Sequence, residues 1–209
     1  MKLVSWNVRG LGNPRTRLAM KKILQLHRPQ LLFLCEIKLL SRQANEECRR
    51  LNLDNCFAVN RIGMSGGLAM MWNSEITVNI TSYSSYHIDA IIQNDSGKRW
   101  RCTGIYGHPE AQQKRHTCTL MRRLKGLSPL PWLCIGDFNE IMHPNEKSGG
   151  NDRNVSTISE FREAVYDCNP IDVGYKGHPY TWSNRQFGSH HIEERLDRAL
   201  CSKDWGNFF

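Results

Sequence analysis

The fold is decided by the stretch Leu31-Leu32-Phe33-Leu34-Cys35-Glu36, in which five apolar residues are followed directly by a carboxylate. A short continuous apolar run of this kind is typical of a strand that is buried on both faces. A carboxylate at the end of such a strand is costly to bury unless it is paired, hydrogen-bonded or bound to a metal. We therefore expect a central strand here, with Glu36 at the edge of its sheet.

The residues on either side of this run predict further regular structure. A strand is expected at Lys2–Trp6, and Pro14 suits the first turn of a helix that continues to about His27. Ser41 is expected to cap a second helix that runs through Arg50. The chain thus begins as strand, helix, strand, helix.

The rest of the chain mixes short strands with helices. The expected strands lie at Phe57–Asn60, Leu68–Trp72, Thr77–Tyr83, His87–Gln93, Trp100–Ile105, Trp132–Ile135, Tyr180–Trp182 and Arg195–Leu200. The expected helices lie at Gln112–Leu127 and Ser156–Val165, the second with a capping box from Thr157 to Glu160. This pattern predicts a layered α/β protein, one domain over residues 1–209, with a mixed sheet or a sandwich.

Composition limits the class of protein. Of the 209 residues, 40% are apolar, which is enough to bury a core and excludes whole-chain disorder. The longest apolar runs fall far short of the roughly 18 residues that a membrane span needs, so no membrane partner is expected. The eight cysteines include no C-x-x-C pair, and those in apolar runs are typical of reduced core cysteines in an intracellular protein.

The positive charge is concentrated near the N-terminus. The net charge is +8, and residues 1–50 hold 11 basic and 3 acidic side chains. The remaining residues hold 17 of each kind. This distribution fits a nucleic-acid-binding surface, and it equally fits a solvated helix face that is rich in Lys and Arg.

Polar residues stand where several of the expected strands end. They are Asn7, Glu36, Tyr106, Asp137 and Asn139. Ligands bind at the strand ends of α/β folds, so these residues are candidates for one shared site. The alternative is that each is a solvated loop residue.

Five ordered blocks of the sequence resemble one known family, the endonuclease/exonuclease/phosphatase superfamily. The blocks are Ser5–Leu11, Cys35–Lys38, Gly104–Gly107, Gly136–Glu140 and Arg195–Leu200. The chain is most similar to the endonuclease domain of plant LINE-type retrotransposons, and Pro179–Asn184 and Glu194–Arg198 are typical of that branch.

The resemblance implies a fold and an activity. The fold would be a DNase I-like, four-layer, two-sheet α/β sandwich with the helices outside. The activity would be Mg²⁺-dependent hydrolysis of a phosphodiester bond, which nicks target DNA to prime reverse transcription. DNA would be the main partner, a reverse transcriptase would be encoded elsewhere in the element, and the protein would be intracellular, in the nucleus.

The resemblance also implies roles for individual residues. Glu36 would bind Mg²⁺ with Asn7 beside it, because a hard cation that retains several waters needs few protein oxygen ligands. Asn7, Asn139 and Thr181 would bind the substrate. The catalytic residues would be Asp137, which orients or deprotonates water, and Asn139, Tyr106 and Asp197 around the phosphate.

The family has a Ser-Asp-His motif on its last strand, whose His is oriented by the Asp that corresponds to Asp197. No Ser-Asp-His occurs in residues 1–209. We therefore expect the last strand and the partner of Asp197 to be missing. Two alternatives stay open: an inactive remnant that still binds DNA, and a phosphatase that acts on a small phosphorylated lipid or inositol.

Overall fold

The computed structural model describes residues 1–206. The chain divides into two compact units, an N-terminal unit, Met1–Ile105, and a C-terminal unit that begins at Tyr106.

The first sheet of the N-terminal unit contains the buried central strand that the apolar run predicts. Its order is β1 (Leu3–Asn7), β2 (Leu31–Cys35), β4 (Leu68–Trp72) and β3 (Asn55–Val59). The first two strands are parallel and the other pairs are antiparallel. All five residues of β2 are buried.

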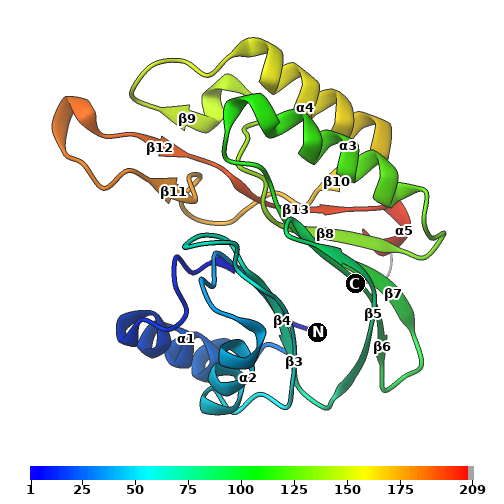
Figure 1. The fold of residues 1–209 in the computed structure, drawn as a ribbon. Helices are drawn as coiled ribbons and strands as arrows, with labels where there is room; N and C mark the ends of the chain where they lie inside the picture. Colours follow the sequence, from blue (N-terminus) through cyan, green and yellow to red (C-terminus); the bar gives the residue numbers. More distant parts are fainter. Residues whose placement is uncertain (207–209) are drawn as a thin grey trace. The chain divides into compact units, whose positions relative to one another are not determined.

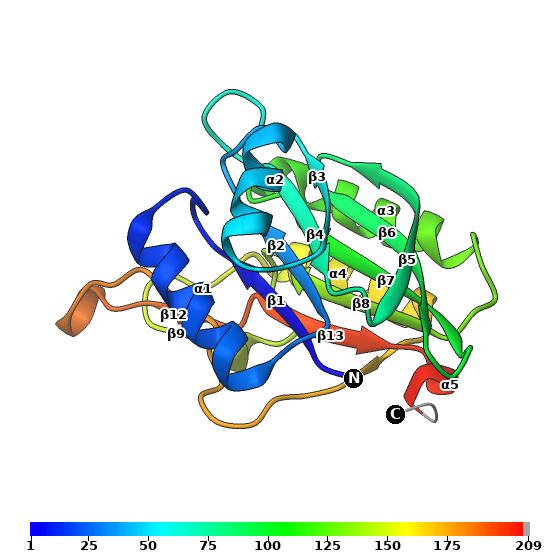
Figure 2. The same ribbon diagram turned by 90° about the horizontal axis from the view of Figure 1, so that it is seen from below.

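Two helices cover one face of this sheet, α1 (Pro14–His27) and α2 (Ser41–Arg50) (Figures 1 and 2). Met20 of α1 and Ala44 of α2 belong to one apolar cluster with Leu32 and Leu34 of β2. The expected cap of α2 is wrong by one residue. Ser41 is the first helical residue, and the side chain of Gln43 accepts the N–H of the cap residue Leu40 at 3.0 Å.

A second sheet faces the other side of β2. Its strands β5 (Ile76–Ser84), β6 (His87–Asn94) and β7 (Arg99–Tyr106) pair antiparallel. Gly104 of β7 lies against Phe33 so closely that a Cβ on this glycine would be 2.1 Å from the ring. Two sheets packed face to face, with helices on the outside, confirm the predicted α/β sandwich.

The C-terminal unit places two helices beside an antiparallel sheet. Strand β8 (Trp132–Asp137) pairs with β13 (Asp197–Cys201), which pairs with β10 (Ile171–Asp172). Helices α3 (Lys114–Lys125) and α4 (Val155–Cys168) pack against each other (Figure 1). A small three-stranded sheet follows, made of β9 (Lys147–Ser148), β12 (Glu193–Glu194) and β11 (Trp182–Ser183).

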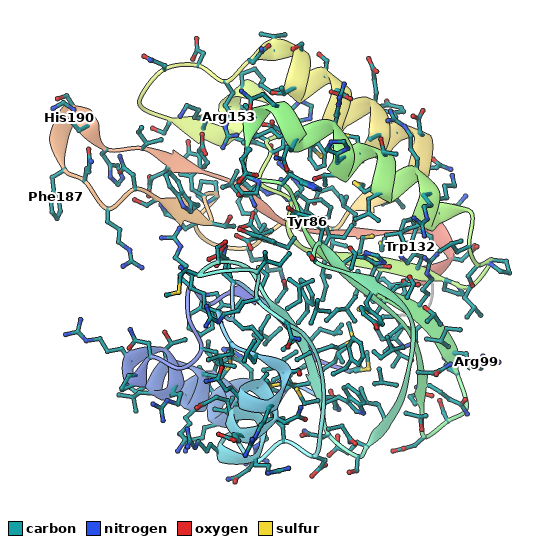
Figure 3. All side chains as sticks on the ribbon, viewed as in Figure 1. Tyr86, Arg99, Trp132, Arg153, Phe187 and His190 are labelled. Carbon is teal, nitrogen blue, oxygen red and sulfur yellow. The ribbon has the colours of Figure 1, made fainter. Side chains whose placement is uncertain are left out.

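Short helical turns complete the described elements: η1 (Ala111–Gln113), η2 (Pro144–Glu146), η3 (Gly188–His190) and α5 (Lys203–Gly206). The expected capping box of α4 is wrong, because the side chain of Asn154 caps this helix and accepts the N–H of Ser156 at 2.9 Å. Around η3 the chain is exposed, with Phe187 and His190 at its surface (Figure 3). Among the described residues, no helix has the length and apolar character needed to cross a membrane.

Candidate functional site

Asn7 and Glu36 lie at one edge of the first sheet in the N-terminal unit. Asn7 is the last residue of β1 and is in register with Cys35, the last residue of β2. Glu36 follows Cys35 directly. Because β1 and β2 are parallel, their carboxyl ends meet, and the structure brings Asn7 and Glu36 to the same strand edge as the sequence predicts.

The backbone at this edge is tightly fixed. Beyond the strand ends, Gly10 donates its N–H to the carbonyl of Glu36 at 2.8 Å, and Leu11 donates to Ile37 at 3.0 Å. Glu36 has a φ of 55°, a left-handed conformation that is unusual for a residue with a side chain. Such conformations cluster at functional sites, where the surrounding structure enforces them.

The donor set at this edge suits a hard divalent cation. The carboxylate of Glu36 is 16% exposed, and its Oε2 lies 3.4 Å from Nζ of Lys38. The side-chain oxygen of Asn7 accepts the N–H of Arg9 at 3.3 Å. In the part of the chain that the structure describes, no three or more His, Cys, Asp or Glu side chains are placed so that they could hold a metal ion together. One carboxylate and one amide oxygen fit Mg²⁺, which retains several of its waters, better than Zn²⁺.

A second group of predicted residues lies in the C-terminal unit, at the end of β8. Asp137 is the last residue of that strand and is in register with Asp197, the first residue of β13. Only 3% of the surface of Asp137 is exposed. Its Oδ1 accepts the N–H of Asn139 at 2.9 Å. The structure therefore holds Asp137, Asn139 and Asp197 at one edge of this sheet.

The side chain of Asn139 is held by the segment that follows Tyr106. Its Nδ2 donates to the carbonyl of Gly107 at 2.7 Å, and Gly107 donates its N–H to the carbonyl of Asp137, also at 2.7 Å. An amide nitrogen has two hydrogens, so Asn139 keeps a second donor for a ligand. Tyr106, which precedes Gly107, is 7% exposed.

Thr181 has a structural contact that the sequence did not predict. Its hydroxyl accepts the backbone N–H groups of Leu196 and Asp197, each at 3.0 Å. Thr181 therefore fixes the start of β13 and the backbone of Asp197. The hydroxyl hydrogen is still able to donate to a substrate oxygen, because a hydroxyl both donates and accepts.

The sequence analysis missed a cluster of ion pairs that contacts the main-chain carbonyl of Asn139. Lys114 pairs with Glu140 at 2.8 Å, and Lys147 pairs with Glu194 at 3.0 Å. Arg153 also pairs with Glu194, with its Nε 2.9 Å from Oε1. One signal was available, since Glu140 directly follows Asn139 in a segment that was already a candidate for the site.

The cluster shifts the pKa values of its own members. Burial alone would raise the pKa of Glu194, but the hydrogen bonds and charges of Arg153 and Lys147 outweigh burial and hold this pKa below its usual value. Burial lowers the pKa of Lys114, although Glu140 opposes this effect. In the ordinary range of pH the carboxylate of Glu194 is therefore charged and bonded to its cations.

The chain matches the sequence model of the endonuclease/exonuclease/phosphatase family over residues 4–208. No curated protein matches it in sequence.

Solved structures share its fold. One is the endonuclease domain of TRAS1, a telomere-specific non-LTR retrotransposon, with 10% identity and a TM-score of 0.72, covering 98% of this chain and 86% of that one. The 3′-5′ exonuclease NExo from Neisseria meningitidis has 18% identity and a TM-score of 0.73, covering 98% and 88%. An AP endonuclease from Archaeoglobus fulgidus has 14% identity and a TM-score of 0.74, covering 97% and 86%. With nearly all of its length matched by the family model, the chain belongs to the endonuclease/exonuclease/phosphatase family.

Proposed function

We propose that this protein is a Mg²⁺-dependent phosphodiesterase that nicks DNA, the target-cleaving endonuclease domain of a retrotransposon. The observation that supports the chemistry best is the fixed pair at the end of β8. There the buried carboxylate of Asp137 accepts the N–H of Asn139, and the amide of Asn139 is bonded to Gly107. Family membership and the retrotransposon-like sequence blocks support the choice of substrate.

In this proposal the residues of the C-terminal unit activate the attacking water and bind the phosphate. Asp137 orients the attacking water and accepts its proton. The second amide hydrogen of Asn139 and the hydroxyl of Tyr106 donate to the phosphate oxygens, which holds the phosphorus in line with the water. The hydroxyl of Thr181 donates to a phosphate oxygen from the same strand edge. Asp197, whose backbone N–H Thr181 accepts, stands where the Asp of the family orients a histidine.

Glu36 and Asn7 hold the metal in this proposal. Mg²⁺ held by these two residues would supply positive charge to offset the negative charge that builds up during hydrolysis. Before the metal binds, the ammonium of Lys38 balances the negative charge of Glu36, whose Oε2 lies 3.4 Å from its Nζ.

The surface of the N-terminal unit supports DNA as the substrate. All three acidic residues of the first fifty lie beside cations: Glu36 beside Lys38, Glu46 beside Arg42, and Glu47 beside Arg17 and Arg50. Other cations of this unit are exposed and form no ion pair among the described residues: Arg15, Lys21, Lys22, Arg28 and Arg49. A duplex that these side chains contact would release counterions, so its affinity should fall steeply with salt.

A nicking assay on supercoiled plasmid tests the proposal. With Mg²⁺ we expect conversion to the nicked circle, and with EDTA or with Asp137→Asn we expect none. Binding of a DNA duplex in EDTA should weaken roughly 10³-fold or more between 50 and 200 mM salt if six or more phosphates are neutralised. Binding without nicking would instead indicate the inactive remnant. Release of phosphate from inositol phosphates, with neither binding nor nicking, would indicate the phosphatase.

A further inference from the structure

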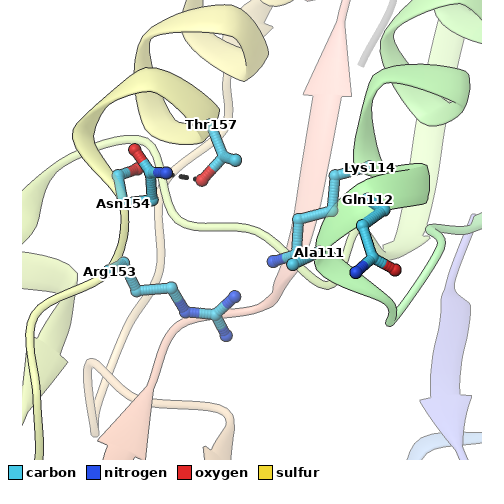
Figure 4. A pocket seen from close by; sticks show the side chains of 6 residues that line it. All are labelled: Ala111, Gln112, Lys114, Arg153, Asn154 and Thr157. Carbon is cyan, nitrogen blue, oxygen red and sulfur yellow. Dashed lines mark hydrogen bonds between the residues drawn. The ribbon is translucent and has the colours of Figure 1, made fainter.

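The main-chain carbonyl of Asn139 accepts hydrogen bonds from two cations, of which Lys114 is buried and Arg153 is half-buried. Nζ of Lys114 donates to it at 2.6 Å, and Nη1 of Arg153 donates at 3.3 Å. Figure 4 shows the two charged groups turned toward one another, Lys114 from the first residue of α3 and Arg153 from the loop before α4. They line a cavity of about 300 Å³, together with Asn154 and Thr157. A single carbonyl with two charged donors is held more firmly than an ordinary loop carbonyl.

Each of the two cations is itself fixed by a buried carboxylate. Lys114 is paired with Glu140 at 2.8 Å, and their side chains are 10% and 3% exposed. Arg153 is paired with Glu194, whose side chain is 7% exposed. Nη1 of Arg153 also lies 3.6 Å from Oε1 of Glu140. Burying so many charges is costly, and hydrogen bonds that use the remaining donors help to offset that cost. The carbonyl of Asn139 supplies such an acceptor for both cations.

The backbone that these cations hold is not relaxed. Asn139 has a φ of 54°, in the left-handed region. Asparagine tolerates this conformation better than most residues, but a loop of this kind can turn back to ordinary dihedral angles when its contacts are lost. A change in φ at Asn139 would move its carbonyl away from the two cations and would turn the Cα–Cβ bond at the same time, and with it the direction of the side-chain amide.

We infer that Lys114 and Arg153 are positioning residues for Asn139: they hold its carbonyl so that its amide points at the phosphate. Glu140 and Glu194 keep the two cations in place. This inference rests on the proposed function, because it is the nicking reaction that needs the amide of Asn139. It adds two residues that do not touch the substrate themselves and act only through Asn139.

Lys147 provides a matched control for Lys114. Both lysine side chains are 10% exposed, and each forms an ion pair with a buried carboxylate, at 3.0 Å for Lys147 and 2.8 Å for Lys114. Among the described residues, Lys147 donates no side-chain hydrogen bond to Asn139. Replacement of either lysine by methionine removes one buried ion pair, but only Lys114→Met also removes a donor to the carbonyl of Asn139.

The kinetic test compares Lys114→Met with Lys147→Met in the plasmid assay. We expect the two variants to lose similar stability to urea. The kcat for nicking should fall about 10–100-fold in Lys114→Met and less than about threefold in Lys147→Met, with KM nearly unchanged in both. Equal losses of kcat in the two variants would mean that the cluster has only a structural role, and would overturn the inference.

A double-mutant cycle tests whether the effect acts through Asn139. Asn139→Gly removes the amide and retains a residue that favours a positive φ. In that background Lys114→Met should lower kcat by no more than about twofold, because there is no amide left to position. A further loss as large as in the wild-type background would show that Lys114 acts by another route.

A spectroscopic measurement tests the inference even if the protein does not nick DNA. The side-chain NH₂ signal of Asn139, assigned by its absence in Asn139→Gly, reports the 2.7 Å bond to Gly107. In Lys114→Met this signal should shift and its hydrogens should exchange faster, while in Lys147→Met it should stay unchanged. An unchanged signal in Lys114→Met refutes the positioning role. Failure of wild-type protein to nick, with the NMR result as expected, refutes only the proposed function.

Discussion

Replacement of Gly107 by alanine should disrupt the candidate site, because the added methyl group has no room there. A Cβ on Gly107 would lie 2.1 Å from the carbonyl oxygen of Phe138 and 2.5 Å from its carbonyl carbon. Both are backbone atoms, so no side chain is able to rotate away. Since real Cβ atoms essentially never lie within 3.0 Å of another heavy atom, the two segments must separate by about 0.9 Å.

The cost follows from what this separation disturbs. Overpacking of a rigid contact costs about 1–3 kcal/mol. The displaced backbone also carries two hydrogen bonds of 2.7 Å, from Gly107 to Asp137 and from Asn139 to Gly107. Each is worth about 0.5–1.5 kcal/mol, so the total loss in free energy of unfolding should be about 2–6 kcal/mol. A shift of nearly 1 Å at Asn139 should also reduce nicking about 10²-fold.

Urea unfolding and plasmid nicking measure the two effects. Gly126→Ala is the matched control, because the nearest atom to its Cβ, the carbonyl oxygen of Arg123, is 3.8 Å away and its φ is −73°. We expect this control to be neutral or slightly more stable than wild type. If Gly107→Ala is as stable and as active as Gly126→Ala, then the close approach of these two segments is not a feature of the folded protein.

Three further outcomes are expected. Glu36→Gln should weaken Mg²⁺ binding, measured by calorimetry, about 10–100-fold or more, and Lys38→Met should strengthen it. Equal affinity for Mg²⁺ in Glu36→Gln and wild type would contradict the assignment of Glu36 as a metal ligand. Asp137→Asn should bind Mg²⁺ like wild type but nick at least about 10²-fold more slowly, so normal nicking would rule out its role as base. Burial alone would raise the pKa of both Glu146 and Glu194. In the folded protein both pKa values are nevertheless lowered, that of Glu146 by Arg198 and that of Glu194 by Arg153 and Lys147. These two carboxyls therefore stabilise the folded protein at pH values above their unfolded pKa of about 4.5. This stabilisation is lost as the pH falls through their lower pKa values in the folded protein. Urea unfolding between pH 7 and pH 3 should show this loss, and Glu194→Gln should show less of it.

Much of the sandwich could be predicted, because its strands are encoded locally. The run that forms β2 is apolar at every position, and a strand buried on both faces has no other requirement. Boundaries were less certain because caps depend on single side chains. Asn154 and Thr157 both precede apolar positions of α4, and the sequence does not show which side chain accepts the first N–H.

The ion pairs behind Asn139 could not be predicted, for a physical reason. Lys114 and Glu140 are 26 positions apart, and Arg153 and Glu194 are 41 apart. A charged residue in an amphipathic helix is normally assigned to its solvated face, and nothing local marks Lys114 as buried. Only the folded chain brings each cation to its carboxylate.

The positions of Glu36 and Asn139 show how the local and the distant information combine. Each residue follows a strand that is apolar at almost every position, Glu36 directly and Asn139 two residues later, and each has a left-handed φ, of 55° and 54°. The sequence located both residues because a polar group at such a point is conspicuous. It did not reveal what holds them there: the N–H of Gly10 on the carbonyl of Glu36, and the side chains of Lys114 and Arg153 on the carbonyl of Asn139. In both cases the residue with the functional group directly follows a strand or lies two residues beyond it. The backbone conformation that orients this group is held by residues far away in the sequence. A substitution that spares the chemical group but removes its distant support should therefore lower the rate of the reaction and leave the affinity for DNA in place.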